Sequence, residues 1–186
     1  MNPKSKWNIK YIDRLNTDEE ISANARLMNL SAYFTGGEAL DFACGLGGNS
    51  MFLARSNYQV HAKDISEVAI EYLKEQAENQ QLAIFPILCD LTDVSSLQLK
   101  DCSVDLIVIT YYLDRALFPI VKSIIKENGF FFMETFYRSS QTENQGVSNK
   151  FKLEPQELLT EFGDWKVLFY EENEHEGRQT IFCQKV

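Results

Sequence analysis

The chain has 186 residues, of which 45% are hydrophobic and 24% charged, and its formal net charge is −9. This length suits one domain with a sizeable core, and the composition is ordinary for a globular protein. The acidic balance argues against nucleic acid as a partner, because proteins that bind phosphates carry basic patches. The sequence has no apolar run of about 18 residues and no signal-peptide pattern at its start, so we expect no membrane span. We therefore expect a cytoplasmic protein that acts on a small molecule.

The cysteines are scattered along the chain, at Cys44, Cys89, Cys102 and Cys183. They form no C-x-x-C pair and have no neighbouring histidine, so the pattern predicts reduced, mostly buried thiols and no metal site. The two histidines, His61 in an expected strand and His175 in an expected turn, are interpreted as structural.

The first half of the chain predicts alternating helices and strands. The stretch TDEE, residues 17–20, has the form of a capping box and predicts a helix start. Apolar residues at helical spacing continue this helix, namely Ile21, Ala25, Met28 and Ala32. Strands are expected over 38–43, 58–65 and 82–91, with helices over 49–55 and from the cap Ser66 to about 80. Pro86 cannot donate to a strand ladder, so the third strand should lie at an edge or carry a bulge.

The second half opens on the most apolar strand, over 104–110, which is typical of a strand buried on both faces. A helix over 116–126, a strand over 128–136 after an Asn-Gly turn, a polar surface loop over 139–150 and a helix over 154–162 follow. The strands over 165–172 and 178–186 are joined by a short connection and must be antiparallel. The predicted fold class is α/β, a Rossmann-like sheet of seven mostly parallel strands with an antiparallel last strand and helices on both faces.

The turn after the first strand reads DFACGLGGNS, residues 41–50. Glycines at 45, 47 and 48 allow close approach of a ligand, although a purely structural turn is the alternative. Asp64, at the end of the second strand, suits the two hydroxyls of a ribose. The dinucleotide fingerprint is incomplete, because Ser50 stands where Gly or Ala is needed. The negative charge of Asp41 is unfavourable beside a pyrophosphate but suits a ligand with an ammonium or sulfonium.

The order D-x-A-x-G-x-G-G-N, followed by an acid at the next strand end, resembles the class I S-adenosylmethionine-dependent methyltransferases. VDLIVITYYLDRALFPIV, NGFFFMETF, NKFKLEPQELLTEF and VLFYEE are similar to the small bacterial methyltransferases of the tellurite-resistance type, and KWNIKYIDRL resembles their W-(D/N)-x-x-Y segment. The resemblance implies a single methyltransferase domain over 1–186, with residues 1–35 as a helical cap over the site. S-adenosylmethionine is then the cofactor.

The same resemblance implies roles by position. The turn would line the methionine part of the cofactor, and Asp41 would bind its amino group through water or backbone. Asp64 would hold the ribose, and the residues near 65 and 90 the adenine. The complete set of cofactor-binding candidates is Asp41, Ala43, Cys44, Gly45, Gly47, Asn49, Asp64, Ile65, Asp90, Leu91, Thr110 and Tyr111. Two positions depart from the family: Ala43 replaces its first glycine, and Lys63 replaces an apolar residue and is expected to extend to solvent.

The sequence contains no catalytic triad and no N-P-P-Y-like turn. This fits methyl transfer, in which the enzyme mainly aligns the acceptor and excludes water. Candidates for the acceptor pocket are Trp7, Tyr11, Tyr112, Arg115, Glu134, Tyr137 and Arg138. Both arginines have a structural alternative, a salt bridge for Arg115 and extension to solvent for Arg138. Arg138→Ala is expected to weaken turnover and to leave cofactor affinity unchanged.

The predicted function is S-adenosylmethionine-dependent methylation of a small molecule, such as a thiol or a chalcogen oxyanion, by a monomer or homodimer. One alternative is a non-catalytic module that binds S-adenosylmethionine or S-adenosylhomocysteine. The other is a nicotinamide-dependent oxidoreductase, which Ser50, Asp41 and the antiparallel last hairpin disfavour.

Overall fold

The computed structural model describes residues 2–97, 99–139 and 146–186. It divides into two compact units, residues 1–98 and 99–186. The first unit holds α1 (Pro3–Leu15), α2 (Ala25–Asn29), β1 (Gly37–Phe42), α3 (Gly48–Arg55), β2 (Tyr58–Asp64), α4 (Glu67–Gln80) and β3 (Ile84–Leu88), with short 3₁₀ turns at Ser31–Tyr33 and Val94–Leu97. The second holds β4 (Val104–Thr110), α5 (Leu117–Ile124), β5 (Ile125–Phe136), a 3₁₀ turn at Asn149–Phe151, α6 (Glu157–Glu161), β6 (Lys166–Asn173) and β7 (Arg178–Gln184).

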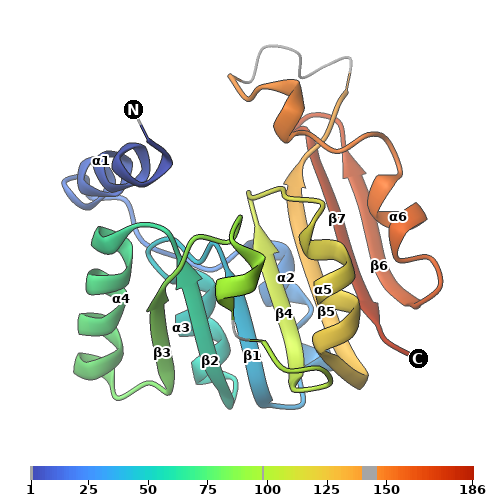
Figure 1. The fold of residues 1–186 in the computed structure, drawn as a ribbon, viewed down its shortest axis with the longest axis horizontal. Coiled ribbons are helices and arrows are strands. Elements are labelled where there is room, and N and C mark those ends of the chain that lie inside the picture. The colour runs from blue at the N-terminus through green and yellow to red at the C-terminus, as the bar shows by residue number, and fades with distance from the viewer. Residues whose placement is uncertain (1, 98, 140–145) are drawn as a thin grey trace. The chain divides into compact units, whose positions relative to one another are not determined.

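The strands of the first unit are parallel and follow the order β3-β2-β1. Figure 1 shows α4 running alongside them. Residues 39–42 of β1 are all buried, as the apolar pattern predicts. Pro86 lies on β3, which is the edge strand, and pairs in register with Ala62 of β2. The predicted edge position of this proline is therefore confirmed. Because the strands are parallel, Asp41 near the end of β1 and Asp64 at the end of β2 lie on the same side of this unit.

The predicted helix start at Thr17 is wrong. Helix α1 begins earlier, where Asn2 caps it by accepting a hydrogen bond from Ser5 N at 2.8 Å, and it ends at Leu15. The Thr17 hydroxyl instead donates to the carbonyl of Arg14 at 2.7 Å, so it stabilises a helix end. Residues 18–24 are not helical. The residues expected to share one helix are divided: Ile21 precedes α2, which contains Ala25 and Met28, and Ala32 lies in a 3₁₀ turn.

Helix α1 lies against α4. Lys4 forms an ion pair with Glu67, and the Ser66 hydroxyl donates to Asn8 Oδ1 at 2.6 Å. Ser66 is also the predicted cap of α4, since its hydroxyl accepts from Ala69 N. Below these polar contacts lies an apolar cluster whose buried members are Tyr11, Leu46 and Ala69, with Trp7, Ile21, Val68 and Tyr72 packed against them.

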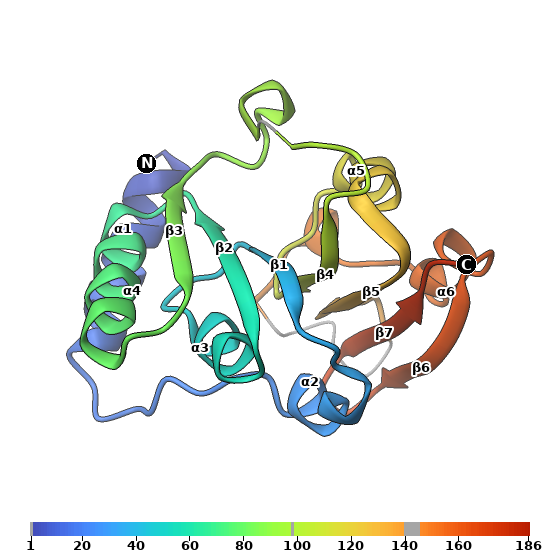
Figure 2. The ribbon, with the colours of Figure 1, turned by 90° about the horizontal axis from the view of Figure 1, so that it is seen from below.

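In the second unit the strand order is β4-β5-β7-β6, and β7 is antiparallel to both of its neighbours (Figure 2). Two predicted helices are shorter than expected, because α5 ends at Ile124 and α6 covers only Glu157–Glu161. Strand β5 begins directly at Ile125, before the Asn-Gly pair. Asn128 has φ +65°, and the register between β4 and β5 shifts there.

The predicted fold class is confirmed: seven strands, mostly parallel, with an antiparallel last strand and helices packed around them. Within the described ranges no helix is long and apolar enough to cross a membrane. Of the polar loop expected over 139–150, residues 140–145 lie outside the described residues. The four cysteines are free thiols, and all but Cys102 are buried. His61 contacts Glu38 at 3.0 Å and stacks on Phe85, which agrees with a structural role.

Candidate functional site

Asp41 is the buried acid of the turn after β1. Its side chain has no exposed surface. The Ser50 hydroxyl donates to Oδ2 at 2.6 Å, but Oδ1 has no hydrogen-bond partner among the described residues. Burial raises the pKa of Asp41 to about 7, against the Ser50 hydrogen bond, which lowers it. A buried carboxylate oxygen without a donor is costly, so this atom is suited to a cationic ligand.

The turn itself is shaped by close packing as well as by positive φ angles. Gly47 has φ +82°, and a Cβ atom there would lie 2.3 Å from Leu73 Cδ1 of α4. A Cβ atom on Gly45 would lie 2.9 Å from the Tyr11 hydroxyl. Ala43 also has φ +54°, a left-handed conformation that glycine adopts more readily than a residue with a Cβ atom. The structural interpretation of the glycines therefore holds in part. At both Gly45 and Gly47, another side chain of the protein occupies the space that a Cβ atom would need.

Asp64, at the end of β2, is also buried, with 4% of its surface exposed. Its Oδ2 accepts from Gly45 N and its Oδ1 from Ser66 N, both at 2.9 Å. Burial raises the pKa of Asp64, and these hydrogen bonds oppose the rise. Burial likewise raises the pKa of Tyr11, so its phenol stays protonated.

A cavity of about 390 Å³ lies beside the end of β2. Ile65, Leu88, Cys89 and Asp90 line one part of it, and the first residues of α1, from Asn2 to Lys4, line another. Two of the predicted adenine-binding residues, Ile65 and Asp90, thus border one space. Asp90 Oδ1 accepts from the amide and hydroxyl of Thr92, and Leu91 is buried next to it.

The remaining candidates of this turn have structural partners. Cys44 is buried, and burial raises the pKa of its thiol well above the usual value. Asn49 Oδ1 accepts from Asn24 N at 2.8 Å, which fixes the segment that leads into α2. Lys63 does not extend to solvent as expected. It is 6% exposed, and its Nζ donates to the carbonyl of Leu97 at 3.0 Å, because a buried ammonium needs an acceptor.

In the second unit, Thr110 ends β4 and Tyr111 follows it with φ +58°. This strained backbone is typical of functional sites. The Tyr111 hydroxyl donates to Glu134 Oε1 at 3.1 Å, and Thr180 donates to Oε2 at 3.0 Å. Glu134 is only 1% exposed, so the acceptor candidate at this position is a buried, hydrogen-bonded carboxylate.

Arg178 is a candidate that the sequence reasoning missed. Its Cζ lies 3.7 Å from the ring centroid of Phe136 and 4.9 Å from that of Tyr111. Its Nη1 is buried and has no hydrogen-bond partner among the described residues. The available signal was the antiparallel last strand. Because β7 pairs antiparallel with β5, its first residue, Arg178, lies opposite Phe136 at the end of β5.

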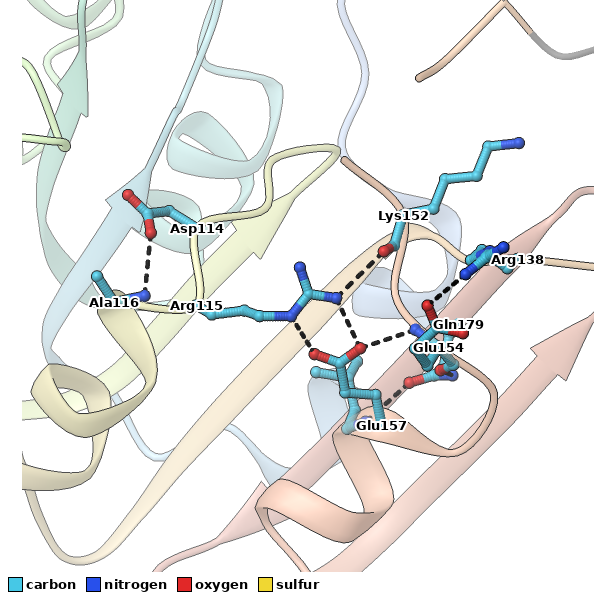
Figure 3. Close-up of polar contacts among 9 residues, drawn as sticks. Asp114, Arg115, Ala116, Arg138, Lys152, Glu154, Glu157 and Gln179 are labelled. Atoms are coloured by element: carbon cyan, nitrogen blue, oxygen red, sulfur yellow. Dashed lines mark hydrogen bonds and ion pairs between the residues drawn. The ribbon is translucent and has the colours of Figure 1, made fainter. Parts of the chain in front are cut away.

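The two arginines that the sequence singled out are paired with glutamates (Figure 3). Arg115 donates from Nε and Nη2 to Glu157, at 2.6 and 2.8 Å, and from Nη2 to the carbonyl of Lys152. Arg138 Nη1 lies 2.8 Å from Glu154 Oε1. The Glu157 carboxylate also accepts from Glu154 N, so these side chains form one network on the surface of this unit. The structural alternative for Arg115, a salt bridge, matches its contacts.

The aromatic acceptor candidates lie in both units. Trp7 and Tyr11 stack on each other in α1, with ring centroids 5.6 Å apart. Tyr137 is buried and forms a β-bridge with Leu153, and Tyr112 is half-buried after β4. The structure thus brings Tyr11 to the cofactor candidates Gly45 and Asp64 within the first unit.

The fold matches a S-adenosylmethionine-dependent methyltransferase from Aquifex aeolicus with a TM-score of 0.71 at 16% identity, over 100% of both chains. It therefore has the class I methyltransferase fold. A family model described as tellurite resistance protein TehB matches residues 8–181, so the chain belongs to the TehB family, as its motifs predict.

TehB from Haemophilus influenzae matches this chain in sequence and in structure. The probable S-adenosyl-L-methionine-dependent methyltransferase TehB of strain Rd is 28% identical over 146 residues, which are 77% of this chain and 51% of that protein. The crystal structure of TehB from Haemophilus influenzae superimposes with a TM-score of 0.77 at 22% identity, over 97% of this chain and 67% of that one. The chain spans about half the length of the curated relatives it matches. These relatives support the predicted enzyme class and cofactor.

Proposed function

We propose that this protein is a S-adenosylmethionine-dependent methyltransferase that acts on a small anionic acceptor. The observation that carries the cofactor assignment is Asp41, a fully buried acid with one oxygen left without a donor. Membership of the TehB family and the methyltransferase fold support the same assignment.

The residues of the first unit fit the parts of this cofactor. Asp41 Oδ1 offers an acceptor to the ammonium of the methionine part, and the charge pair would lower the raised pKa of this carboxyl. The Asp64 carboxylate is suited to the ribose hydroxyls. The cavity beside Ile65 and Asp90 offers an apolar wall and polar groups for the adenine. When bound, the cofactor supplies an electrophilic methyl group on its sulfonium.

The acceptor is proposed to be an anion because Arg178 has no anionic partner among the described residues, whereas Arg115 and Arg138 are paired. The rings of Phe136 and Tyr111 hold the guanidinium in place and exclude water from it. An oxyanion or a thiolate brings its own lone pair, so this chain's residues need only bind and orient it. A chalcogen oxyanion such as tellurite or selenite and a small thiol are the classes that fit.

The test is production of S-adenosylhomocysteine by the purified protein with tellurite, selenite and a set of small thiols. We expect turnover with at least one acceptor, and Arg178→Ala should raise KM for it about tenfold or more, since a charge-assisted hydrogen bond is lost. Cofactor affinity should stay unchanged. Arg138→Ala is the comparison: a larger loss there than in Arg178→Ala would return the acceptor role to the residue that the sequence indicated.

A non-catalytic binding module remains the second candidate, because the buried acids serve binding and turnover equally. It predicts binding of S-adenosylmethionine with no S-adenosylhomocysteine formed from any acceptor. Such a result would remove the methyl-transfer part of the proposal and keep its cofactor part.

A further inference from the structure

We propose that Lys63 is a positioning residue for the base of the cofactor: its ammonium holds the segment that follows β3, and through this segment it places the carboxylate of Asp90 at the adenine pocket. This inference rests on the proposed function, because it assumes that Asp90 meets the adenine. It deepens that function by giving a role to a lysine that stands where an apolar residue is expected.

The segment after β3, residues 89–97, contains no α-helix and ends in a short 3₁₀ turn. Two hydrogen bonds tie its two ends to adjacent residues of β2. The amide of Cys89 donates to the carbonyl of Asp64 at 2.9 Å, and Nζ of Lys63 donates to the carbonyl of Leu97 at 3.0 Å. The segment is therefore a loop that is closed onto the end of β2.

The burial of Lys63 indicates that its ammonium serves this anchor. The residue is 6% exposed, and a buried ammonium is costly unless it has an acceptor. Leu91 and Leu97 of the loop are buried as well, so apolar packing already holds the loop on this unit. What a lysine adds to this packing is a directional bond, which fixes where the Leu97 carbonyl lies.

The carboxylate of Asp90 is oriented by its own loop. Its Oδ1 accepts from the amide and the hydroxyl of Thr92, at 3.0 and 2.7 Å. Among the described residues no donor is bonded to Oδ2, so this oxygen is available to the exocyclic amine of an adenine. The bonds from Thr92 orient the carboxylate within the loop, but they do not fix the loop relative to β2.

The end of β2 thus sets three parts of the pocket relative to one another. Lys63 anchors the loop that carries Asp90. The next two residues, Asp64 and Ile65, are the candidates for the ribose and for one wall of the adenine cavity. A hydrogen bond to the adenine amine requires the Asp90 carboxylate to lie within about 3 Å of it while the ribose and wall contacts are kept. Loss of the Lys63 anchor therefore weakens this one contact selectively.

The experiment measures how well the protein distinguishes adenine from hypoxanthine. Calorimetric titration gives the affinities for S-adenosylhomocysteine and for S-inosylhomocysteine, in which a carbonyl replaces the exocyclic amine. The wild type should prefer the adenine compound about 30-fold or more, because the analogue leaves Asp90 without its donor. Lys63→Met fills the same space without the anchor. We expect it to lose about tenfold in affinity for S-adenosylhomocysteine and to keep its affinity for the inosine compound.

Lys185→Met is the matched control. The Lys185 side chain is 17% exposed, and its Nζ donates to the carbonyls of Lys122 and Ile125 at 2.8 and 3.0 Å. The substitution removes a comparable bond from lysine to backbone, but at the end of α5 in the second unit. It should leave the ratio of the two affinities unchanged even where it lowers the melting temperature.

Two further variants complete the test. In an Asp90→Ala background, Lys63→Met should change neither affinity, because a residue that acts through Asp90 then has nothing to position. If a thermal melt shows that Lys63→Met does not fold, Lys63→Gln replaces it. The shorter glutamine keeps a donor but draws the Leu97 carbonyl toward β2, so the preference for adenine should again fall.

The outcomes separate this role from the proposed function. An equal loss for both compounds in Lys63→Met, an unchanged preference in the folded variant, or a further loss in the Asp90→Ala background overturns the positioning role and leaves the proposed function standing. Equal affinity of the wild type for both compounds also overturns it, since Asp90 then does not meet the amine. Failure of the wild type to bind either compound overturns the proposed function and this inference together.

Discussion

The ends of β1 and β2 carry two aspartates in comparable positions but in different states. Asp41 and Asp64 both lie at carboxyl ends of parallel strands, both are buried, and burial raises the pKa of each. Asp41 accepts the Ser50 hydroxyl and keeps one oxygen without a donor, whereas each oxygen of Asp64 accepts a backbone amide, from Gly45 and from Ser66. The number of hydrogen-bond donors on each carboxylate, and not the residue type, therefore decides which acid keeps an oxygen free to accept from a ligand.

The largest effect is expected for Asp64→Ala. Loss of this carboxylate leaves the buried amides of Gly45 and Ser66 without an acceptor, which should lower the free energy of unfolding by about 3 kcal/mol. Binding of S-adenosylhomocysteine should be lost. Urea unfolding followed by circular dichroism measures the first effect, and calorimetric titration measures the second. A variant as stable as the wild type would show that the turn does not depend on Asp64.

Asp41→Asn should have the opposite effect on stability. The pKa of Asp41 rises from its ordinary value of 3.8 to about 7, so between these values the folded protein holds a proton that the unfolded chain releases. The free energy of unfolding therefore falls as the pH rises through this window. Asp41→Asn removes the titration, and its melting temperature should exceed that of the wild type by a few degrees at pH 8, with a smaller gain at pH 5. An equal shift at both values would contradict the raised pKa.

Cofactor binding gives the second half of this test. Asp41→Asn should weaken S-adenosylhomocysteine binding about 100-fold, because the charged partner of the ammonium is lost. For the wild type, the affinity should rise from pH 5.5 to pH 7 as Asp41 ionises and level off above about 7. The variant should show a flat profile over this range. A pH dependence that survives in Asp41→Asn would assign the titration to another group.

The smallest effect is expected for the backbone of the turn after β1. Ala43 has φ +54°, which costs a residue with a Cβ atom about 1–2 kcal/mol. Ala43→Gly relieves this strain but adds freedom to the unfolded chain, so we expect a net gain of about 0.5 kcal/mol, or 1–2 °C in melting temperature. Ala62→Gly in the extended strand β2 is the control and should lower the melting temperature. A loss in Ala43→Gly would show that the turn is not strained at this position.

The sequence predicted the strands better than the helices near the N-terminus. Strands such as β4 form long apolar runs whose burial follows from composition, and Pro86 indicated the edge of the sheet. The error at Thr17 has a specific cause. A hydroxyl three residues before a glutamate suits a helix start, but here it donates to the carbonyl of Arg14, because the helix was already begun by Asn2 and Pro3.

The position of the cofactor candidates at two strand ends was predictable because a motif of short range carries them. Asp41, the glycines and Asp64 have a fixed spacing around two strand ends. The state of Asp64 was not predictable from its own strand end, since one of its two donors is the amide of Gly45 in the turn after the neighbouring strand. Lys63 was misjudged for the same reason, because its acceptor is the distant carbonyl of Leu97.

By itself the sequence determined the succession of strands, the fold class and the family, since these depend on local periodicity and spacing. Tertiary structure alone decided which charges are paired. Arg115 and Arg138 meet glutamates from α6 and from the segment before it, while the hairpin carries Arg178 onto two aromatic rings. An ion pair depends on distance in space, and the chain reaches those distances only after it has folded.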